Sequence, residues 1–70
     1  MDILVFKTNV IDRKQVRKLF PVLRTLDGIT RWNVDLHDID KVLRIEAVSI
    51  SPRYIETILQ QAGYFCKELD

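Results

Sequence analysis

The segment ITRWNVDLHDIDKVLRIEA, residues 29–47, contains two runs in which apolar and polar residues alternate. A period of two residues is typical of a strand that buries one of its faces. Between the runs, residues 37–40 include two aspartates, which favour a turn. The segment therefore predicts an antiparallel hairpin. The residues expected to face the core are Trp32, Val34, Leu36, Leu43, Ile45 and Ala47.

A strand and a helix are predicted before this hairpin. Residues 3–6, ILVF, precede the polar break at residues 7–9, as expected for a strand of about six residues. Residues 12–26 predict a helix with Asp12 as its N-cap and Gly28 as its stop signal, and Pro21 predicts a kink or a tightening near residues 17–21. Phe20 and Trp32 are expected to pack the helices onto the sheet. The apolar stripe of this helix is Val16, Leu19, Phe20, Leu23 and Leu26.

A second helix and a last strand are predicted after the hairpin. Ser51 as N-cap and Pro52 at the first helical position begin the helix, and Gly63 ends it. Residues 64–69 then predict a short strand that contains Cys66. The inward positions of the helix are Ile55, Ile58, Leu59 and Ala62.

The resulting order is βαββαβ, which predicts the α+β class with a ferredoxin-like fold. In that fold two helices cover one face of a four-stranded antiparallel sheet. One domain spanning residues 1–70 is expected. This topology brings residues 7–12, 37–40 and 63–64 to the same end of the molecule, which we call the loop end. A binding site built from loops is expected there, and Cys66 is expected to lie away from the loop at residues 7–12.

Composition narrows the classes of function. The net charge is only +1, divided into +4 for residues 1–31 and −3 for residues 32–70, so neither nucleic acid nor a membrane is an expected partner. The lone cysteine, Cys66, excludes a disulfide or a Cys₂ or Cys₄ metal cage within the chain. No signal-peptide pattern and no apolar stretch near the ~20 residues of a membrane span occur, which favours a cytoplasmic location. The absence of a Ser-His-Asp set or a Gly-rich phosphate loop predicts no enzyme activity and no cofactor.

The first helix carries a basic face that consists of Arg13, Lys14, Arg17 and Lys18. Few acidic residues stand at i+4 to pair with these cations, so the face predicts a protein partner with an acidic surface. RNA binding on the open face of the sheet is not expected, because the hairpin offers no aromatic platform there. The residues of that face are Arg31, Asn33, Asp35, Val42, Arg44 and Glu46.

Four segments of the chain resemble the heavy-metal-associated domain, a family that includes copper chaperones and the N-terminal modules of metal-transporting ATPases. The segments are DGI at 27–29, WNVDL at 32–36, VLRI at 42–45 and IETILQQAGY at 55–64, and the resemblance covers roughly residues 3–68. It implies a metal-binding loop between the first strand and the first helix. Members of the family hold Cu(I) or a similar soft metal between the two thiolates of a Met-x-Cys-x-x-Cys motif in that loop.

This chain lacks both thiols of the motif. Alignment from the first strand places Lys7 at the methionine and Asn9 and Asp12 at the cysteines. Counting back from Gly28 places Asp12 and Gln15 at the cysteines instead. Tyr64 matches a position where the family carries an aromatic residue or lysine near the metal. The alternative interpretation is that Tyr64 only begins the last strand. Copper transfer by the family's mechanism is therefore not expected, and the candidate binding residues of the loop end are Lys7, Asn9, Asp12 and Tyr64.

These features together predict a non-catalytic interaction or regulatory module that uses either the basic face or the loop end. Metal handling with non-standard ligands is the alternative. A hard cation would use the oxygens of Asn9, Asp12, Asp38 and Asp40, although helix capping and turn formation also account for these residues. A soft metal would need a dimer that joins two Cys66 thiols, because Cys66 and His37 alone do not make a preformed site.

Overall fold

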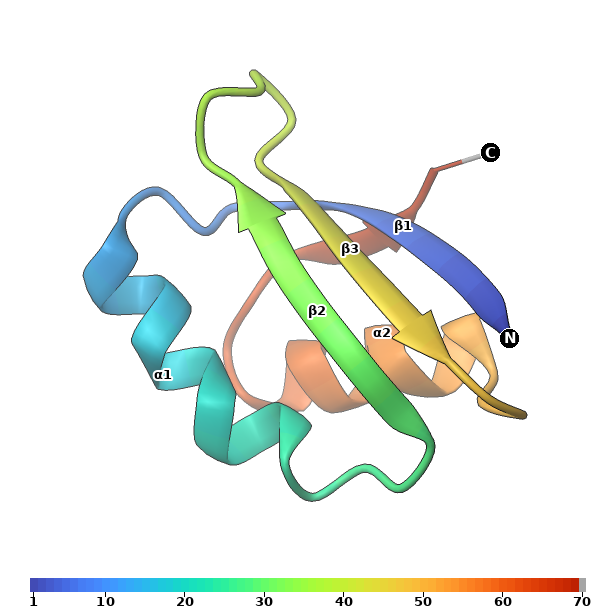
Figure 1. The fold of residues 1–70 in the computed structure, drawn as a ribbon. Coiled ribbons are helices and arrows are strands. Elements are labelled where there is room, and N and C mark those ends of the chain that lie inside the picture. The colour runs from blue at the N-terminus through green and yellow to red at the C-terminus, as the bar shows by residue number, and fades with distance from the viewer. Residues whose placement is uncertain (70) are drawn as a thin grey trace.

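Figure 1 shows the computed structural model, which describes residues 1–69 and follows the predicted βαββαβ order. The strands form an antiparallel sheet in the order β2-β3-β1-β4, and both helices pack against the same face of it. The predicted ferredoxin-like fold is confirmed. The elements are β1 (Asp2–Thr8), α1 (Arg13–Leu23), β2 (Ile29–Asp35), β3 (Val42–Ala47), α2 (Pro52–Gln61) and β4 (Cys66–Glu68).

The hairpin of β2 and β3 places its apolar residues on one face of the sheet, as predicted. Trp32 pairs with Ile45, and Val34 pairs with Leu43. The side chains of β3 are fully buried at the core positions, whereas those of the edge strand β2 are only partly buried. A register shift between Ile29 and Arg31 interrupts the ladder, so regular pairing of β2 begins at Arg31.

Helix α1 begins where the sequence predicts and ends earlier. The Oδ1 atom of Asp12 accepts a hydrogen bond from the backbone N–H of Gln15 at 2.9 Å, which confirms Asp12 as the N-cap. The helix continues through Pro21 and ends at Leu23 rather than at Leu26. The N–H of Leu26 then donates to the carbonyl of Leu23 at 3.1 Å, in a tight turn that keeps the Leu26 side chain buried. Gly28 therefore does not stop the helix.

Two residues predicted to face the core are exposed. Phe20 is 51% exposed, because it lies over the edge strand β2, where no further strand covers it. Its ring packs against that of Trp32, with the ring centroids 4.9 Å apart. Ala62 is exposed because it follows the last turn of α2 as the C-cap residue.

Strand β4 is shorter than the predicted span 64–69. The N–H of Tyr64 donates to the carbonyl of Leu59 at 2.9 Å, which closes the C-terminal end of α2 with Gly63 at a φ of +96°. Residue 64 is thereby held by the helix, and strand pairing with β1 begins only at Cys66. None of the helices in the described range 1–69 is long and apolar enough to cross a membrane.

Candidate functional site

The three loops predicted to share one end of the molecule do meet there. The backbone N–H of Thr8 donates to the carbonyl of Asp40 at 3.1 Å, which joins the end of β1 to the hairpin turn. The side-chain oxygen of Asn9 accepts a hydrogen bond from the N–H of Phe65 at 3.0 Å, which joins the same loop to the segment before β4. The loop end is therefore a connected structure and not three independent loops.

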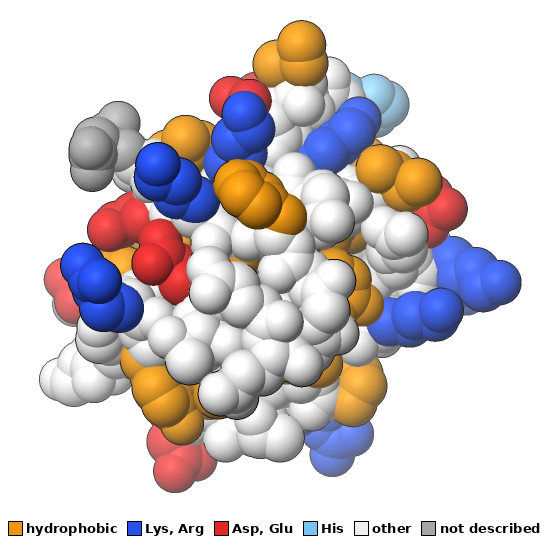
Figure 2. All heavy atoms as spheres, turned by 180° about the vertical axis from the view of Figure 1, so that it is seen from behind, with side chains coloured by type: hydrophobic (Ala, Val, Ile, Leu, Met, Phe, Trp, Pro, Cys, Tyr) orange, Lys and Arg blue, Asp and Glu red, His pale blue; other side chains and the backbone are white. Residues whose placement is uncertain are grey.

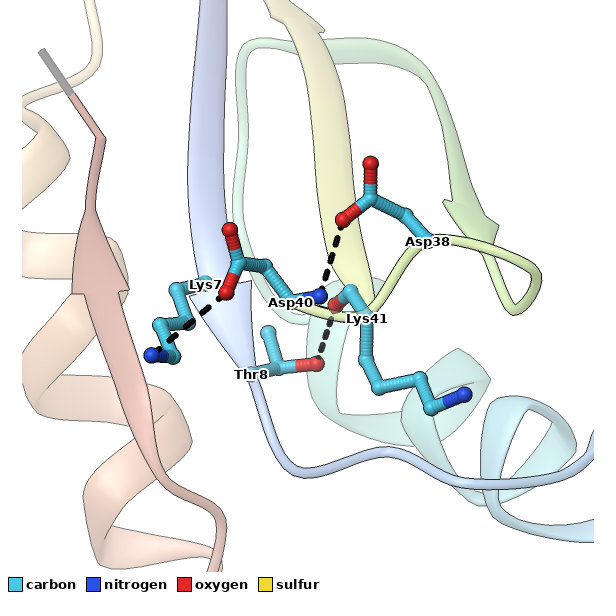
Figure 3. A network of polar contacts seen from close by, with 5 residues as sticks. All are labelled: Lys7, Thr8, Asp38, Asp40 and Lys41. Carbon is cyan, nitrogen blue, oxygen red and sulfur yellow. Dashed lines mark hydrogen bonds and ion pairs between the residues drawn. The ribbon is translucent and has the colours of Figure 1, made fainter.

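Thr8 is the centre of this connection (Figure 3). Its hydroxyl donates to the carbonyl of Lys41 at 2.6 Å and accepts from the N–H of Val10 at 3.2 Å, so both functions of the buried hydroxyl are used. In the turn beside it, the Asp38 carboxylate accepts from the N–H of Asp40 at 2.8 Å. Sequence reasoning missed the role of Thr8, because its partner Lys41 lies in the hairpin and no local pattern marks the pair.

Three of the four candidate residues of the loop end already have an internal partner, and no hydrogen bond or ion pair among residues 1–69 joins one of the four to another. Lys7 forms an ion pair with Asp40 at 3.4 Å, Asn9 accepts a hydrogen bond from the N–H of Phe65, and Asp12 caps α1. Tyr64 lies partly buried against the core. These side chains fix the geometry of the loop end rather than forming an open set of ligands.

The residues of the loop end do not fit the soft metals that the resemblance implies. The family's two positions hold an amide and a carboxylate, and both bond to backbone N–H groups. Cu(I) and similar ions prefer thiolate ligands. Across residues 1–69, no three side chains of His, Cys, Asp or Glu gather in a group able to hold a metal ion. His37, on the hairpin turn, is exposed.

Cys66 lies beside the loop end, contrary to the expectation that it lies away from it. Its Cα pairs with that of Thr8, at the point where β1 enters the loop. The side chain is 1% exposed and belongs to the core, so it is not presented to the loop. Burial, and to a smaller extent the nearby carboxylate of Glu56, raises the pKa of this thiol from 9.0 to about 12. The thiolate that would bind a metal is therefore strongly disfavoured at neutral pH.

The raised pKa of Cys66 predicts a loss of stability in alkaline solution. Above pH 9 the unfolded chain releases the thiol proton while the folded chain retains it, so the free energy of unfolding falls as the pH rises toward 12. We expect the loss at pH 10, relative to pH 8, to be about 1.4 kcal/mol larger for the natural chain than for a Cys66→Ala variant. Urea denaturation at the two pH values measures this difference. Equal losses of unfolding free energy in the two proteins would contradict the raised pKa of Cys66.

The basic face of α1 differs from the loop end, because its cations have no acidic partner in the part of the chain that the structure describes. All four residues, Arg13, Lys14, Arg17 and Lys18, are exposed. The ion pairs among residues 1–69 join Lys7 to Asp40 and Arg31 to Glu46 instead. Figure 2 shows Lys and Arg side chains projecting together from the side on which α1 lies, which is the right side in this view from behind.

Exposed apolar side chains around the loop end were not foreseen from the sequence. Ile39 at the hairpin turn is 92% exposed, and Ile11 and Phe65 are 62% and 48% exposed. Figure 2 shows hydrophobic side chains at the surface of this end, at the top of the view. A lone apolar residue in a loop gives no periodic signal, so sequence reasoning could not separate it from the core.

Comparisons with known proteins identify the fold. No protein-family model and no curated protein matches the sequence. Among solved structures, the N-terminal domain of ZntA in its Zn(II) form is similar with a TM-score of 0.77 and 24% identity, over 94% of this chain and 89% of that one. The yeast copper transporter domain Ccc2a, solved in apo and Cu(I)-loaded states, gives a TM-score of 0.81 at 16% identity, over 97% and 94% of the two chains.

A third similar structure is a complex. The Atx1–Cu(I)–Ccc2a complex gives a TM-score of 0.80 at 16% identity, over 97% of this chain and 94% of the matched one. These neighbours are heavy-metal-associated domains, so the resemblance drawn from the sequence is confirmed for the fold. Their identities to this chain are all below a quarter, and the likeness therefore establishes the fold alone.

Proposed function

We propose that this chain is a non-catalytic protein-interaction module, a single domain over residues 1–70, that binds an acidic protein partner through the basic face of α1. The observation that carries the proposal is that, among residues 1–69, no carboxylate oxygen lies within 4.0 Å of a charged nitrogen of Arg13, Lys14, Arg17 or Lys18. Like charges one helical turn apart destabilise a helix. A partner that supplies the opposite charge would therefore stabilise this face of α1.

The sequence predicts two possible binding surfaces, the basic face of α1 and the loop end. We choose between them by asking whether their polar side chains already form hydrogen bonds or ion pairs within the chain. At the loop end, Lys7, Asn9 and Asp12 each bond within the chain. A partner would have to break those contacts to engage the same atoms. The cations of α1 are exposed and need no rearrangement, and their charge also speeds the encounter with an acidic surface.

The similar structures support an interaction role for the fold. In the Atx1–Cu(I)–Ccc2a complex, a domain of this fold binds another protein with Cu(I) in the assembly. Metal handling is the second candidate for this chain, favoured by the Zn(II) and Cu(I) forms of its structural neighbours. The side chains oppose it, because the loop lacks thiols and the one thiol is buried with a raised pKa.

The proposal predicts that charge reversal on α1 weakens binding of an acidic probe. A labelled peptide of about twelve glutamates should bind the natural chain at about 0.1 M salt, and Arg17→Glu/Lys18→Glu should weaken that binding at least about tenfold, or 1.4 kcal/mol. Fluorescence anisotropy measures the affinity, and circular dichroism checks the fold.

The matched control is Arg44→Glu/Arg53→Glu, which reverses two exposed cations outside α1 and changes the net charge equally. This variant should bind the probe within about threefold of the natural chain, because screening limits the reach of surface charges to roughly 10 Å. If both variants weaken binding to the same extent, net charge and not the basic face is responsible, and the proposal is wrong.

A further inference from the structure

The two edges of the sheet are protected differently. At the β4 edge, two side chains of α2 bond to backbone groups of the strand: Gln60 donates to the carbonyl of Cys66 at 3.1 Å, and Glu56 accepts from the N–H of Glu68 at 2.6 Å. Natural sheets often block an edge with such contacts, because a row of unpaired N–H and C=O groups invites another strand.

The β2 edge has no such protection. Strand β2 pairs only with β3, so alternate residues direct their backbone groups away from the sheet. In the described part of the chain, no side chain forms a hydrogen bond to the backbone of residues 29–35. The regular part of this edge runs from Arg31 to Asp35, beyond the register shift. Five residues match the length of a typical short strand.

The sequence of this edge is complementary to itself. The regular segment is centred on Asn33, so two copies paired antiparallel over its full length place the two Asn33 residues opposite each other. Arg31 of each copy then lies opposite Asp35 of the other. Opposite charges at facing positions stabilise an antiparallel pair, whereas like charges destabilise it. Because a twofold axis repeats every contact, this one register forms two ion pairs across the seam.

The charged groups that meet in this register are available for pairing. The guanidinium of Arg31 bonds to Glu46 through Nε alone, at 3.0 Å, and the Arg31 side chain is 75% exposed. The carboxylate of Asp35 accepts a hydrogen bond from the N–H of His37 at 3.0 Å and has no cation partner among residues 1–69. The two ion pairs across the seam therefore form without breaking a contact within either chain.

The opposite face of the same register joins apolar side chains. Trp32 of each copy faces Val34 of the other, because facing residues of an antiparallel pair share one face of the sheet. An apolar groove of about 620 Å³ lies beside them, between β2 and α1. Phe20 packs on Trp32 in this groove with the ring centroids 4.9 Å apart, and it is 51% exposed. A second copy would cover these side chains, which have no neighbour beyond the edge.

The cations of α1 oppose this pairing only weakly. Arg13 lines the groove and Arg17 stands one turn further along the helix, so the two copies bring like charges to the two sides of the seam. Both side chains are exposed, and the Debye length is about 8 Å at 0.15 M salt, so their repulsion is screened. Charges that face each other at contact distance are screened much less. We therefore expect a weak, reversible association.

We infer that two copies of this chain form a symmetric dimer through the β2 edge, with Arg31 of each copy paired to Asp35 of the other. The dimer joins the two four-stranded sheets into one continuous sheet and keeps all the helices on one face of it. The inference goes beyond the proposed function and does not depend on it, because the ion pairs of the seam lie on the face of the sheet away from α1.

The natural chain provides the first test. Sedimentation equilibrium in about 0.15 M salt should show a reversible monomer–dimer equilibrium with a dissociation constant of about 10–500 µM, as expected for a small interface. As the concentration rises, hydrogen exchange should slow at alternate amides of residues 31–35. Trp32 is the only tryptophan, so its emission should shift to shorter wavelength as the dimer covers it.

Charge exchange tests the register itself. Arg31→Asp and Asp35→Arg should each weaken the dimer at least about tenfold, because each places like charges opposite each other twice. An equimolar mixture of the two variants should associate at least about tenfold more tightly than either variant alone. In the mixed dimer, one chain supplies two carboxylates along the edge and the other supplies two guanidinium groups.

The matched control is Arg44→Asp. Arg44 pairs with Asn33 from β3, on the same face of the sheet as Arg31 but one strand inside the edge. This variant changes the charge as much as Arg31→Asp does and should leave the dissociation constant within about threefold of the natural value. Circular dichroism checks the fold of every variant, and hydrogen exchange on the natural chain decides the question if a variant does not fold.

Three results would overturn the inference. The first is a natural chain that stays monomeric at about 1 mM, a concentration well above the expected dissociation constant. The second is a dimer whose exchange protection lies outside residues 31–35, which would place the interface on another surface. The third is a mixture of Arg31→Asp and Asp35→Arg that associates no better than the separate variants. None of these results bears on binding of the glutamate peptide, so the proposed function stands or fails separately.

Discussion

Replacing Gly28 with alanine is expected to lower the free energy of unfolding by about 2–4 kcal/mol, most of the roughly 3–5 kcal/mol available to a domain of this size. Gly28 has a φ of +98°, a conformation that L side chains rarely adopt. A Cβ atom there would lie 2.6 Å from the backbone oxygen of Val48. That oxygen cannot easily move away, because the N–H of Val48 donates to the carbonyl of Gly28 at 2.8 Å and holds the two segments together.

Gly63 provides the matched control for this substitution. Its φ is +96°, yet a Cβ atom there would meet nothing within 4 Å. Gly63→Ala should therefore cost only the conformational penalty of roughly 1–2 kcal/mol. Urea denaturation of both variants separates the backbone conformation from the steric contact. If the two variants lose the same free energy, the close approach of Gly28 to Val48 makes no contribution.

The sequence predicts the hairpin and the fold well because the signals are strong and local. Alternation over residues 29–47 identifies the inward face of β2 and β3, and Asp12 identifies the start of α1. The same patterns cannot tell how far a helix extends across the sheet. Phe20 lies on the apolar stripe of α1, but the sheet ends at β2, so the residue reaches the surface and forms one wall of a groove.

The loop end shows what topology predicts and what it leaves out. The βαββαβ order correctly brings the three loops together. The contacts inside that end depend on residues far apart in the chain, such as Asn9 with Phe65 and Thr8 with Lys41, and no local pattern encodes them. Cys66 illustrates the same limit, because only the register of β4 against β1 places it opposite Thr8.

The second large expected effect concerns metal affinity. The natural chain should bind neither Cu(I) nor Zn(II) tightly, whereas an Asn9→Cys/Asp12→Cys variant, which restores the family's Cys-x-x-Cys spacing, should bind at least about a hundredfold more tightly. Loss of groups that merely support metal ligands already costs roughly 10–100-fold in affinity, and this chain lacks the thiol ligands themselves. The variant gives up the α1 cap of Asp12 and the hydrogen bond that Asn9 accepts from the N–H of Phe65, which together cost about 2 kcal/mol of stability and leave the fold in place.

The central claim is that this chain acts through protein contacts and not through a bound metal. A titration of the natural chain with Cu(I) and with Zn(II) under reducing conditions tests this claim most directly. The double-cysteine variant is the positive control, and a Cys66→Ser variant tests the buried thiol. We predict no stoichiometric site of sub-micromolar affinity in the natural chain, and no change on replacing Cys66. A stoichiometric, sub-micromolar site in the natural chain would contradict the account of a module that acts through protein contacts. If Cys66→Ser abolished that site, the metal would be held by the buried thiol in a shared dimer.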